Sequence, residues 1–382
     1  MSVWDDLPGQ EAAVGQLRRA AADGTPTHAW LFTGPPGSGR SNAARSFAAA
    51  LQCAAPAPGD RGCGQCQACR TVMAGTHPDV SLVATENVTY AIADVRELIG
   101  RAQDRPSGGK WRVIIMEDAD RMTERTTNVL LKSIEEPPPH TVWILCAPSP
   151  ADVLVTVRSR CRSIGLRVPS RDAVAELLVR RDGLTADQAE FAARVSQGHI
   201  GIARRLARDE GARLRRDRTV RLPLGLRGVS DAVLAAAELV ELATAEATAS
   251  AEERGAADAR QLRETLGLDP DAAVPPQLRS QFKQLEELNK RRARRGANDS
   301  LDRALIDLTT FFRDVLAVQL GTGTELVNDY LARELRAYAG RSTAEQTLAR
   351  IDYIAEARER IAANVQPLLA MEAMMAGLLP DR

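Results

Sequence analysis

The stretch HAWLFTGPPGSGRSNAARSFAAAL, residues 28–51, decides the fold class of the first part of this 382-residue chain. Its apolar beginning, residues 28–33, predicts a buried strand, and small and apolar residues at helical spacing predict a helix over residues 41–51. Between them lie the residues of a phosphate-binding loop: Gly34, Gly37, Gly39, Arg40 and Ser41. Such glycines let backbone N–H groups face a phosphate, the helix N-terminus adds positive potential, and the serine is expected to reach a magnesium ion.

Position 40 departs from that pattern, because arginine stands where the loop normally carries lysine. Lysine is a compact charge on a flexible stem, whereas the arginine head is planar and forked, so the exchange changes how phosphates are held. Only four of the 50 basic residues are lysine, so a general drift toward arginine is one explanation. Lys132 escaped that drift, and we favour a loop that no longer supports hydrolysis. A strand–loop–helix that binds no phosphate is the third alternative.

Further apolar runs alternate with helical patterns up to about residue 165 and predict a parallel sheet covered on both faces: residues 80–84, 113–116 and 142–146. Two acids, Glu117 and Asp118, end the second run. In nucleotide hydrolases such acids hold magnesium and position the attacking water. Their usual order is Asp then Glu, and the inverted order displaces the carboxylates, which weakens a hydrolase interpretation. A solvated acidic strand end is the alternative.

Four of the six cysteines lie close together, at Cys53, Cys63, Cys66 and Cys69. This spacing can close a tetrahedral shell of four thiolates around Zn²⁺, which leaves no open position, so the zinc is expected to be structural. A redox pair is the alternative for a single Cys-x-x-Cys, and four clustered cysteines argue against it. Cys146 lies within an apolar run and is expected to be a core residue.

The rest of the chain is predicted to be helical. Three short patterns predict a small helical lid over residues 167–211, and longer ones predict a helical domain over residues 212–382, with a loop expected over 255–276. The phosphate-loop domain is assigned to residues 1–166. The run KRRARR (290–295) lies in a predicted helix, where a solvated face is favoured over contact with DNA.

Composition excludes several classes of protein. Hydrophobic residues make up 44% and charged residues 26%, as in globular proteins, and no apolar run reaches the length of a membrane span. The first residues lack the basic and apolar order of a signal peptide, so we expect a cytoplasmic protein without membrane contact. The formal net charge is zero, which argues against a protein that coats nucleic acid through bulk charge.

Several motifs together resemble the bacterial clamp-loader subunits of DNA polymerase III, an AAA+ family. They are DLPGQ (6–10), THAWLF (27–32), the cysteine cluster inserted after the phosphate-loop helix, NVLLKSIEEPP (128–138) and Ser159-Arg160-Cys161. GTHPD (75–79) is most similar to the delta-prime branch. The resemblance is dense over residues 3–165, extends to about 210, and beyond that consists only of an all-helical pattern.

The resemblance implies a fold and a role. The fold is an α/β, P-loop AAA+ sheet with an inserted zinc knuckle, followed by an all-α part made of a helical lid and a helical collar for oligomerisation. Clamp loaders are five-subunit spirals that close a sliding clamp on primed DNA, with nucleotide at subunit interfaces. Arg160 would be an arginine finger acting in trans on a neighbour's phosphates. A delta-prime subunit is a stator within the polymerase III holoenzyme, expected to have neither ATPase nor polymerase activity of its own.

Two further departures fit that branch. Residues 146–149, CAPS, lack the small polar residue with which active relatives sense the γ-phosphate, and Gly201 stands where they carry a sensing arginine, unless Arg204 or Arg205 substitutes one turn later. The resemblance implies gamma/tau and delta subunits as partners in a hetero-pentamer, with indirect contact to the clamp and contact to primed DNA. ATP or ADP at the Arg40 loop stays open.

Two other functions stay open as well. One is an ATP-hydrolysing motor subunit of the gamma/tau type, against which Arg40 and Gly201 argue. The other is a zinc-knuckle nucleic-acid-binding protein with a decayed nucleotide fold, for which the 4% aromatic content offers few stacking residues. For Arg160 the alternative is an ordinary surface arginine after a strand. His77 is assigned to a turn rather than to the metal.

Overall fold

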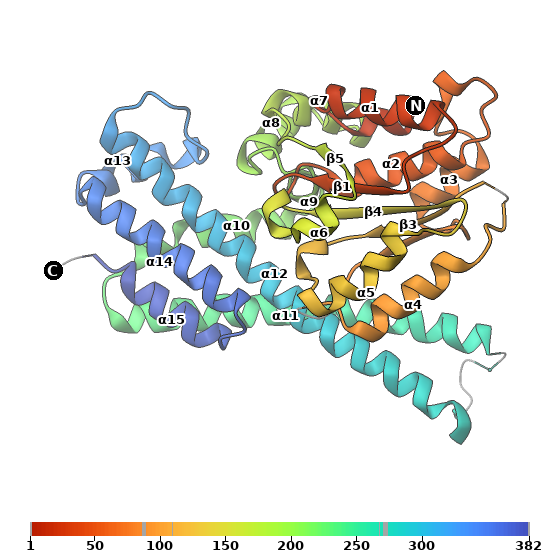
Figure 1. Cartoon of the computed structure of the whole chain (residues 1–382). Helices are drawn as coiled ribbons and strands as arrows, with labels where there is room; N and C mark the ends of the chain where they lie inside the picture. Colours follow the sequence, from red (N-terminus) through yellow and green to blue (C-terminus); the bar gives the residue numbers. More distant parts are fainter. Residues whose placement is uncertain (1, 86–88, 109, 267, 270–273, 381–382) are drawn as a thin grey trace. The chain divides into compact units, whose positions relative to one another are not determined.

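The structure is a computed structural model that describes residues 2–85, 89–108, 110–266, 268–269 and 274–380. The chain divides into two compact units, Met1–Arg208 and Asp209–Arg382 (Figure 1). The first unit contains all five strands, and the described part of the second is helical. The finer boundaries expected at residues 166 and 211 remain predictions.

A five-stranded parallel sheet forms the middle of the first unit, in the order β2-β3-β4-β1-β5. Its strands are β1 (Ala29–Thr33), β2 (Val80–Val83), β3 (Arg112–Met116), β4 (Thr141–Ala147) and β5 (Arg162–Gly165). The predicted parallel α/β sheet is therefore confirmed. The last strand was not predicted, because it is a short edge strand whose residues are exposed except for Ile164.

Each face of the sheet is covered by its own set of helices, as the alternation of side chains along the strands requires. Trp30 and Phe32 of β1 lie in one core cluster with α1 (Glu11–Ala22), α2 (Arg40–Gln52) and α3 (Gln67–Ala74). Leu31 lies in another cluster with α4 (Ile92–Gln103), α5 (Glu124–Glu135) and α6 (Val155–Arg158). Short 3-10 helices lie between these elements: η1 (Val3–Asp6), η2 (Pro58–Asp60), η3 (Ala119–Arg121) and η4 (Pro150–Asp152).

Three short helices complete the first unit: α7 (Arg171–Asp182), α8 (Ala186–Val195) and α9 (Ile200–Arg208). Ser170 and Thr185 cap the first two by accepting hydrogen bonds from backbone N–H groups three residues on. The three helices share a small core of their own, with Leu177 and Leu178 fully covered. The short helical patterns predicted for this segment are thus present.

The second unit is built from six helices with two 3-10 turns, η5 (Pro276–Leu278) and η6 (Asp329–Leu331), in its described residues. The helices are α10 (Glu210–Gly225), α11 (Val229–Thr265), α12 (Arg279–Leu320), α13 (Ala332–Ala339), α14 (Ala344–Ala362) and α15 (Pro367–Gly377). Phe311, Phe312 and Met371 lie at the centre of its core. Within the described residues no helix is both long and apolar enough to cross a membrane.

The loop expected over residues 255–276 is wrong in its first half, because α11 continues to Thr265. Gly255, where the loop was expected to begin, is buried within the helix, and the side chain of Asn289 on α12 lies directly against it. The glycine therefore serves close packing of two helices. Residues 270–273 of the expected loop lie outside the described residues.

Candidate functional site

The phosphate loop lies between β1 and α2, at the carboxyl ends of the parallel strands. Gly34, Gly37 and Gly39 all have positive φ, at 157°, 87° and 88°, so the curled backbone of a phosphate loop is present. Gly39 is the left-handed N-cap of α2, and the helix begins at Arg40. The hydroxyl of Ser38 is buried and has no hydrogen-bond partner among the described residues. The backbone of this loop is therefore suited to an anion.

The charged side chain of the loop, Arg40, binds within the loop itself. The Arg40 guanidinium donates a hydrogen bond to the Gly34 carbonyl, at the other end of the same loop. A lysine that serves a bound nucleotide reaches outward to the phosphates, whereas this arginine binds back on the loop that carries it. The described structure therefore gives Arg40 a partner within the chain.

Two side chains from other segments lie against the loop. A Cβ atom added to Gly37 would lie 2.7–2.8 Å from the side chain and Cα of His199, so the residue before α9 directly covers this glycine. Gln10 donates to the Ser38 carbonyl at 3.2 Å and to the Arg167 carbonyl at 2.6 Å, and its oxygen accepts from Arg167 N–H at 3.1 Å. Gln10 thus ties the loop to the segment leading to the three short helices. Sequence reasoning assigned no role to either side chain.

The acids after β3 and the loop arginine act on the same buried thiol. Burial raises the pKa of the Cys146 thiol, the charges of Glu117 and Asp118 raise that pKa further, and Arg40 lowers it. All three charges therefore act on one buried atom in β4. Asp118 has a φ of 50° and lies 3.8 Å from the Arg121 guanidinium. Cys146 is a core residue as expected, and it lies within electrostatic range of both the predicted acids and the loop arginine.

Arg204, which the sequence offered as a substitute for the sensing arginine, binds a carboxylate of its own unit. Arg204 forms two hydrogen bonds with the Asp182 carboxylate, at 3.0 and 2.9 Å, and Arg208 forms another at 2.6 Å. The Asp182 side chain is 1% exposed. Its burial opposes ionisation, but the hydrogen bonds and charges of the surrounding arginines hold the pKa of Asp182 below its usual value. Arg204 is therefore held within the lid helices.

Arg160, the predicted finger, follows α6 at the start of the edge strand β5. Its side chain is 42% exposed, its Nε lies 2.5 Å from Glu135 Oε1, and its Nη1 donates to the Thr156 carbonyl at 2.7 Å. Glu135 is the last residue of α5, so two elements hold the arginine at the surface of this unit. The sequence quoted Glu135 within a motif, but its pairing with Arg160 depends on the tertiary fold.

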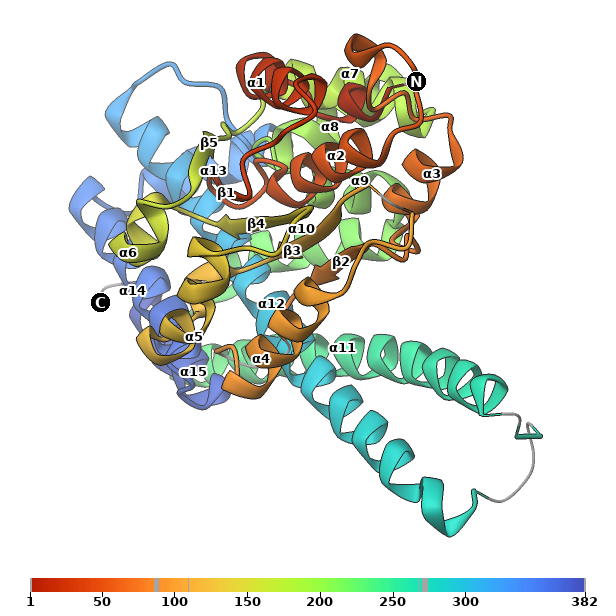
Figure 2. The same cartoon turned by 45° about the vertical axis from the view of Figure 1, so that its right-hand side comes forward.

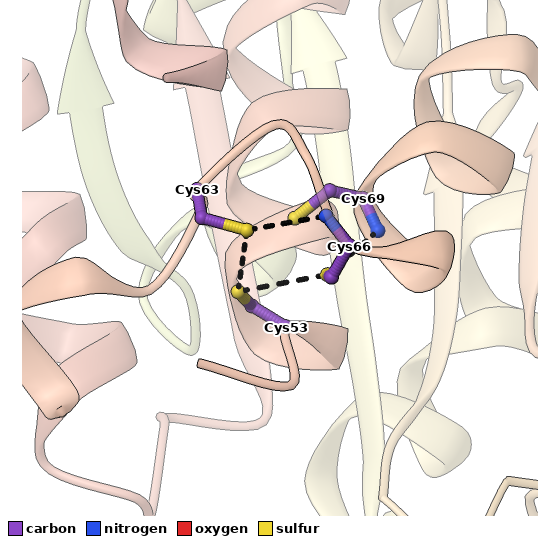
Figure 3. Close-up of side chains that lie close together, drawn as sticks. All are labelled: Cys53, Cys63, Cys66 and Cys69. Carbon is purple, nitrogen blue, oxygen red and sulfur yellow. Dashed lines mark hydrogen bonds between the residues drawn. The ribbon is translucent and has the colours of Figure 1, made fainter. Parts of the chain in front are cut away.

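The four clustered cysteines converge on one point (Figure 3). Their sulfur atoms all lie within 4.8 Å of one another, and Cys53 Sγ lies 3.7 Å from Cys63 Sγ and 3.9 Å from Cys66 Sγ. Four thiolates bound to one zinc at about 2.3 Å lie about 3.8 Å apart, so these separations fit a tetrahedral metal shell. The cluster could therefore hold a metal ion.

Backbone N–H groups point at the same sulfurs. Cys66 N–H donates to Cys63 Sγ and Cys69 N–H to Cys66 Sγ, both at 3.4 Å. Burial alone would raise the pKa of Cys66, but hydrogen bonds from the backbone and the neighbouring thiols lower it to about 6. The pKa of Cys69 is raised, chiefly by burial. Such N–H···S contacts stabilise thiolates, the form that binds metal.

The N-terminal segment packs on this knuckle. Val3 N–H and the Ser2 hydroxyl both donate to the Gly62 carbonyl, at 3.0 and 2.9 Å, and the Trp4 indole donates to the Arg61 carbonyl at 3.0 Å. Trp4 is 5% exposed. His77 accepts a hydrogen bond from Asp79 N–H and belongs to a turn. The knuckle is therefore part of the core of the first unit.

Asp79 has a structural role that the sequence did not reveal. Its carboxylate is fully buried and accepts hydrogen bonds from Ser107 N–H at 2.6 Å and Gly108 N–H at 2.7 Å. Burial opposes ionisation, but these bonds and the Arg112 guanidinium hold the pKa of Asp79 below its usual value. The GTHPD motif thus fixes the loop before β3.

Comparison with known proteins agrees with these motifs. Residues 9–170 match the family described as DNA polymerase III, delta subunit. The chain is 36% identical over 178 residues to DNA polymerase III subunit delta' of Pseudomonas aeruginosa, covering 46% of this chain and 53% of that protein. The Escherichia coli subunit delta' is 34% identical over 178 residues, with the same coverage.

Another branch of relatives matches the same region. The subunit gamma/tau of Mycobacterium tuberculosis is 33% identical over 190 residues, covering 49% of this chain and 33% of that protein. The chain thus spans about half the length of the delta' relatives, and the second unit lies beyond the matched family segment.

Proposed function

We propose that this chain, which is similar to delta-prime subunits over its first unit, is a clamp-loader family member and the stator of a DNA polymerase III clamp loader. In this role it supplies Arg160 as a trans arginine finger to the nucleotide bound by a neighbouring ATPase subunit. It does not hydrolyse ATP itself. Its partners are gamma/tau and delta subunits in a hetero-pentamer, and it meets the sliding clamp indirectly and primed DNA within the assembled complex.

The observation that carries this proposal is the hydrogen bond from Arg40 to the Gly34 carbonyl. Phosphoryl transfer depends on charges placed against the phosphates. Here the loop cation binds its own backbone, His199 covers Gly37, and Arg204 is held by Asp182. Two arginines that an active site would aim at a nucleotide are instead engaged within the chain, and a histidine covers a loop glycine, which supports a silent loop.

Arg160, in contrast to Arg40 and Arg204, is available to a neighbouring subunit in this proposal. It is half-exposed at the surface of the first unit, where the Glu135 carboxylate, the Thr156 carbonyl and the Ser159 hydroxyl hold it. An exposed ion pair of this kind is weak, about 0–1 kcal/mol, so a neighbour's phosphates can replace Glu135. An arginine finger stabilises the charge that spreads over the transferred phosphoryl group.

The finer assignments complete the proposal. The cysteine cluster holds a structural Zn²⁺, since all four positions of a tetrahedron are filled by thiolates. Any ATP or ADP at the loop would be bound by Gly34, Gly37, Gly39, Ser41 and the acids Glu117 and Asp118, with Arg40 displaced from Gly34. Residues 1–166 act as the AAA+ domain, 167–211 as the lid and 212–382 as the oligomerising collar.

A motor subunit of the gamma/tau type is the second candidate. The gamma/tau relatives match the same region at similar identity, and the loop keeps its glycine conformations and Ser41. In that case Arg40 would swing away from Gly34 when nucleotide binds.

The deciding experiment measures DNA-stimulated ATP turnover by the loader reconstituted with clamp and primed DNA. Arg160→Ala is compared with Arg158→Ala, a matched control because Arg158 ends α6 two residues before Arg160 and its side chain donates to the Pro150 carbonyl at 3.0 Å. Arg160→Ala is expected to abolish turnover at one interface, since a finger contributes about 10³–10⁵ in kcat at its site. Arg158→Ala and Arg40→Ala should leave turnover unchanged. Equal losses from Arg40→Ala and Arg160→Ala would favour the motor instead.

A further inference from the structure

The second unit carries a long helical hairpin beyond its hydrophobic core, which we call the arm: residues 244–265 of α11 and 279–300 of α12. The core cluster of the unit stops at Ala243 on α11 and begins again at Leu301 on α12. Figures 1 and 2 show the two helices projecting away from α13, α14 and α15 and diverging toward their far ends. The role proposed above makes no use of this segment.

Small residues hold the two helices of the arm together. Ala247 and Ala251 of α11 are 7% and 5% exposed, and a Cβ atom on Gly296 of α12 would lie 3.2 Å from the Cβ of Ala247. No large apolar side chain of the described arm residues is exposed. The arm is therefore a closely packed helix pair with a polar surface, and it offers no apolar patch to a partner.

The basic run that the sequence singled out is divided by the fold. Arg292 turns toward α11 and pairs with Asp258 at 2.5 Å, and Arg295 lies 3.9 Å from Asp299. Lys290 pairs with Glu286 at 3.1 Å and with Glu287 at 3.2 Å. Three of the run's five charges are thereby used within the arm.

The remaining charges gather on one side of α12. Arg291 and Arg294 are exposed, and so are Arg279 and Lys283 about two to four turns earlier; none of the four meets an acid in the described part of the chain. At about 100° per residue these four, which we call the basic face, lie within about 120° of one another. The residues that contact α11, such as Asn289 and Gly296, lie on the opposite side.

The two outer sides of the arm differ. On α11 the side turned away from α12 carries Ala249, Glu253, Ala256, Arg260 and Glu264, all exposed. On α12 the outer side carries the four residues of the basic face together with Lys290 and two acids, Glu286 and Glu287. Lys290 forms an ion pair with each of these acids. Basic residues thus outnumber acids on the outer side of α12, whereas the outer side of α11 carries two acids and one arginine.

We propose that the basic face binds the sugar-phosphate backbone of nucleic acid without reading its sequence. From Arg279 to Arg294 the helix rises by about 23 Å, the length of about seven phosphates on one strand. Backbone binding needs only positive charge and donors, which these side chains supply. An acidic protein partner would be expected to meet an apolar centre in the interface, and the described arm surface has none.

The test uses the isolated full chain and a short fluorescein-labelled DNA duplex, with fluorescence anisotropy read across about 50 to 200 mM salt. Arg291→Gln/Arg294→Gln should weaken binding and lower the slope of log K against log salt by about 1.8, since each lost phosphate contact removes about 0.9. Adding Arg279→Gln and Lys283→Gln should bring the loss to about 3.6. Glutamine is a good helix former, so circular dichroism should show unchanged helix content.

The matched control is Arg254→Gln/Arg260→Gln, which removes two exposed arginines from the other helix of the arm. It should leave the slope within experimental error of the wild type. A control that weakens binding as much as the basic-face variant would overturn the proposal, because only net charge would then matter. So would poly-glutamate binding more tightly than the duplex, which would assign the face to an acidic protein. This assay involves no ATP turnover, so its failure leaves the stator role untouched.

Discussion

Replacing Cys66 by serine tests the metal centre and the packing that depends on it. Cys66 is the N-cap of α3, and its sulfur accepts a hydrogen bond from Cys69 N–H. Serine is among the best N-cap residues, so Cys66→Ser keeps the cap while removing one thiolate from the tetrahedron. Any loss of stability therefore reports the metal rather than the helix.

The magnitude follows from what rests on the knuckle. Trp4 is almost fully buried there, and an aromatic of this size buries about 150–250 Å². At about 25 cal/mol per Å² this corresponds to about 4–6 kcal/mol, or about 2–5 kcal/mol once residual burial in the unfolded chain is allowed for. At about 2–4 °C per kcal/mol for a unit of this size, Tm should fall by about 5–20 °C.

The assay combines thermal unfolding by circular dichroism with metal content by mass spectrometry. Wild type should contain one zinc per chain, and Cys66→Ser should contain less and unfold earlier. Cys161→Ala is the control, because Cys161 lies outside the cluster. A Cys66→Ser protein that retains one zinc and the wild-type Tm would refute the assignment. A wild type that unfolds at the same temperature with and without a chelator would refute it equally.

Three further outcomes are expected. Gly37→Ala should lower the free energy of unfolding by about 2–5 kcal/mol in urea, because it combines left-handed strain with a collision against His199; an unchanged midpoint would mean that this contact does not form. Asp182→Asn should lower the free energy of unfolding by about 1–3 kcal/mol, because Arg204 loses its carboxylate partner although water screens the exposed guanidinium. An unchanged free energy of unfolding in the same urea titration would mean that the pairing of Asp182 with Arg204 does not stabilise the fold. Because the pKa of Asp79 is lowered in the folded protein, its charge stabilises the fold above about pH 4, and this stabilisation is lost as pH falls through the folded pKa. The Tm difference between wild type and Asp79→Asn should therefore be large at pH 7 and shrink below about pH 4. A Tm difference that is independent of pH would contradict the assigned charge.

Much of the first unit follows from local patterns in the sequence. The apolar runs and the loop glycines predicted β1 to β4 and α2, because a buried parallel strand must be apolar on both faces and a phosphate loop needs glycine at left-handed positions. The cysteine spacing predicted the cluster because four thiols close together in the sequence can reach one point without help from distant segments. The edge strand β5 and the full length of α11 were missed, since exposed strand residues and a packing glycine carry no local signal.

The sequence by itself determined the sheet, the phosphate loop, the cysteine cluster and the family resemblance. The tertiary structure decided where each charge goes. Arg40 binds Gly34, Arg160 meets Glu135, and the basic run separates into paired and unpaired arginines. Secondary structure depends on patterns a few residues long, whereas the partner of an arginine is chosen by which distant segments the folded chain brings within reach of its long side chain.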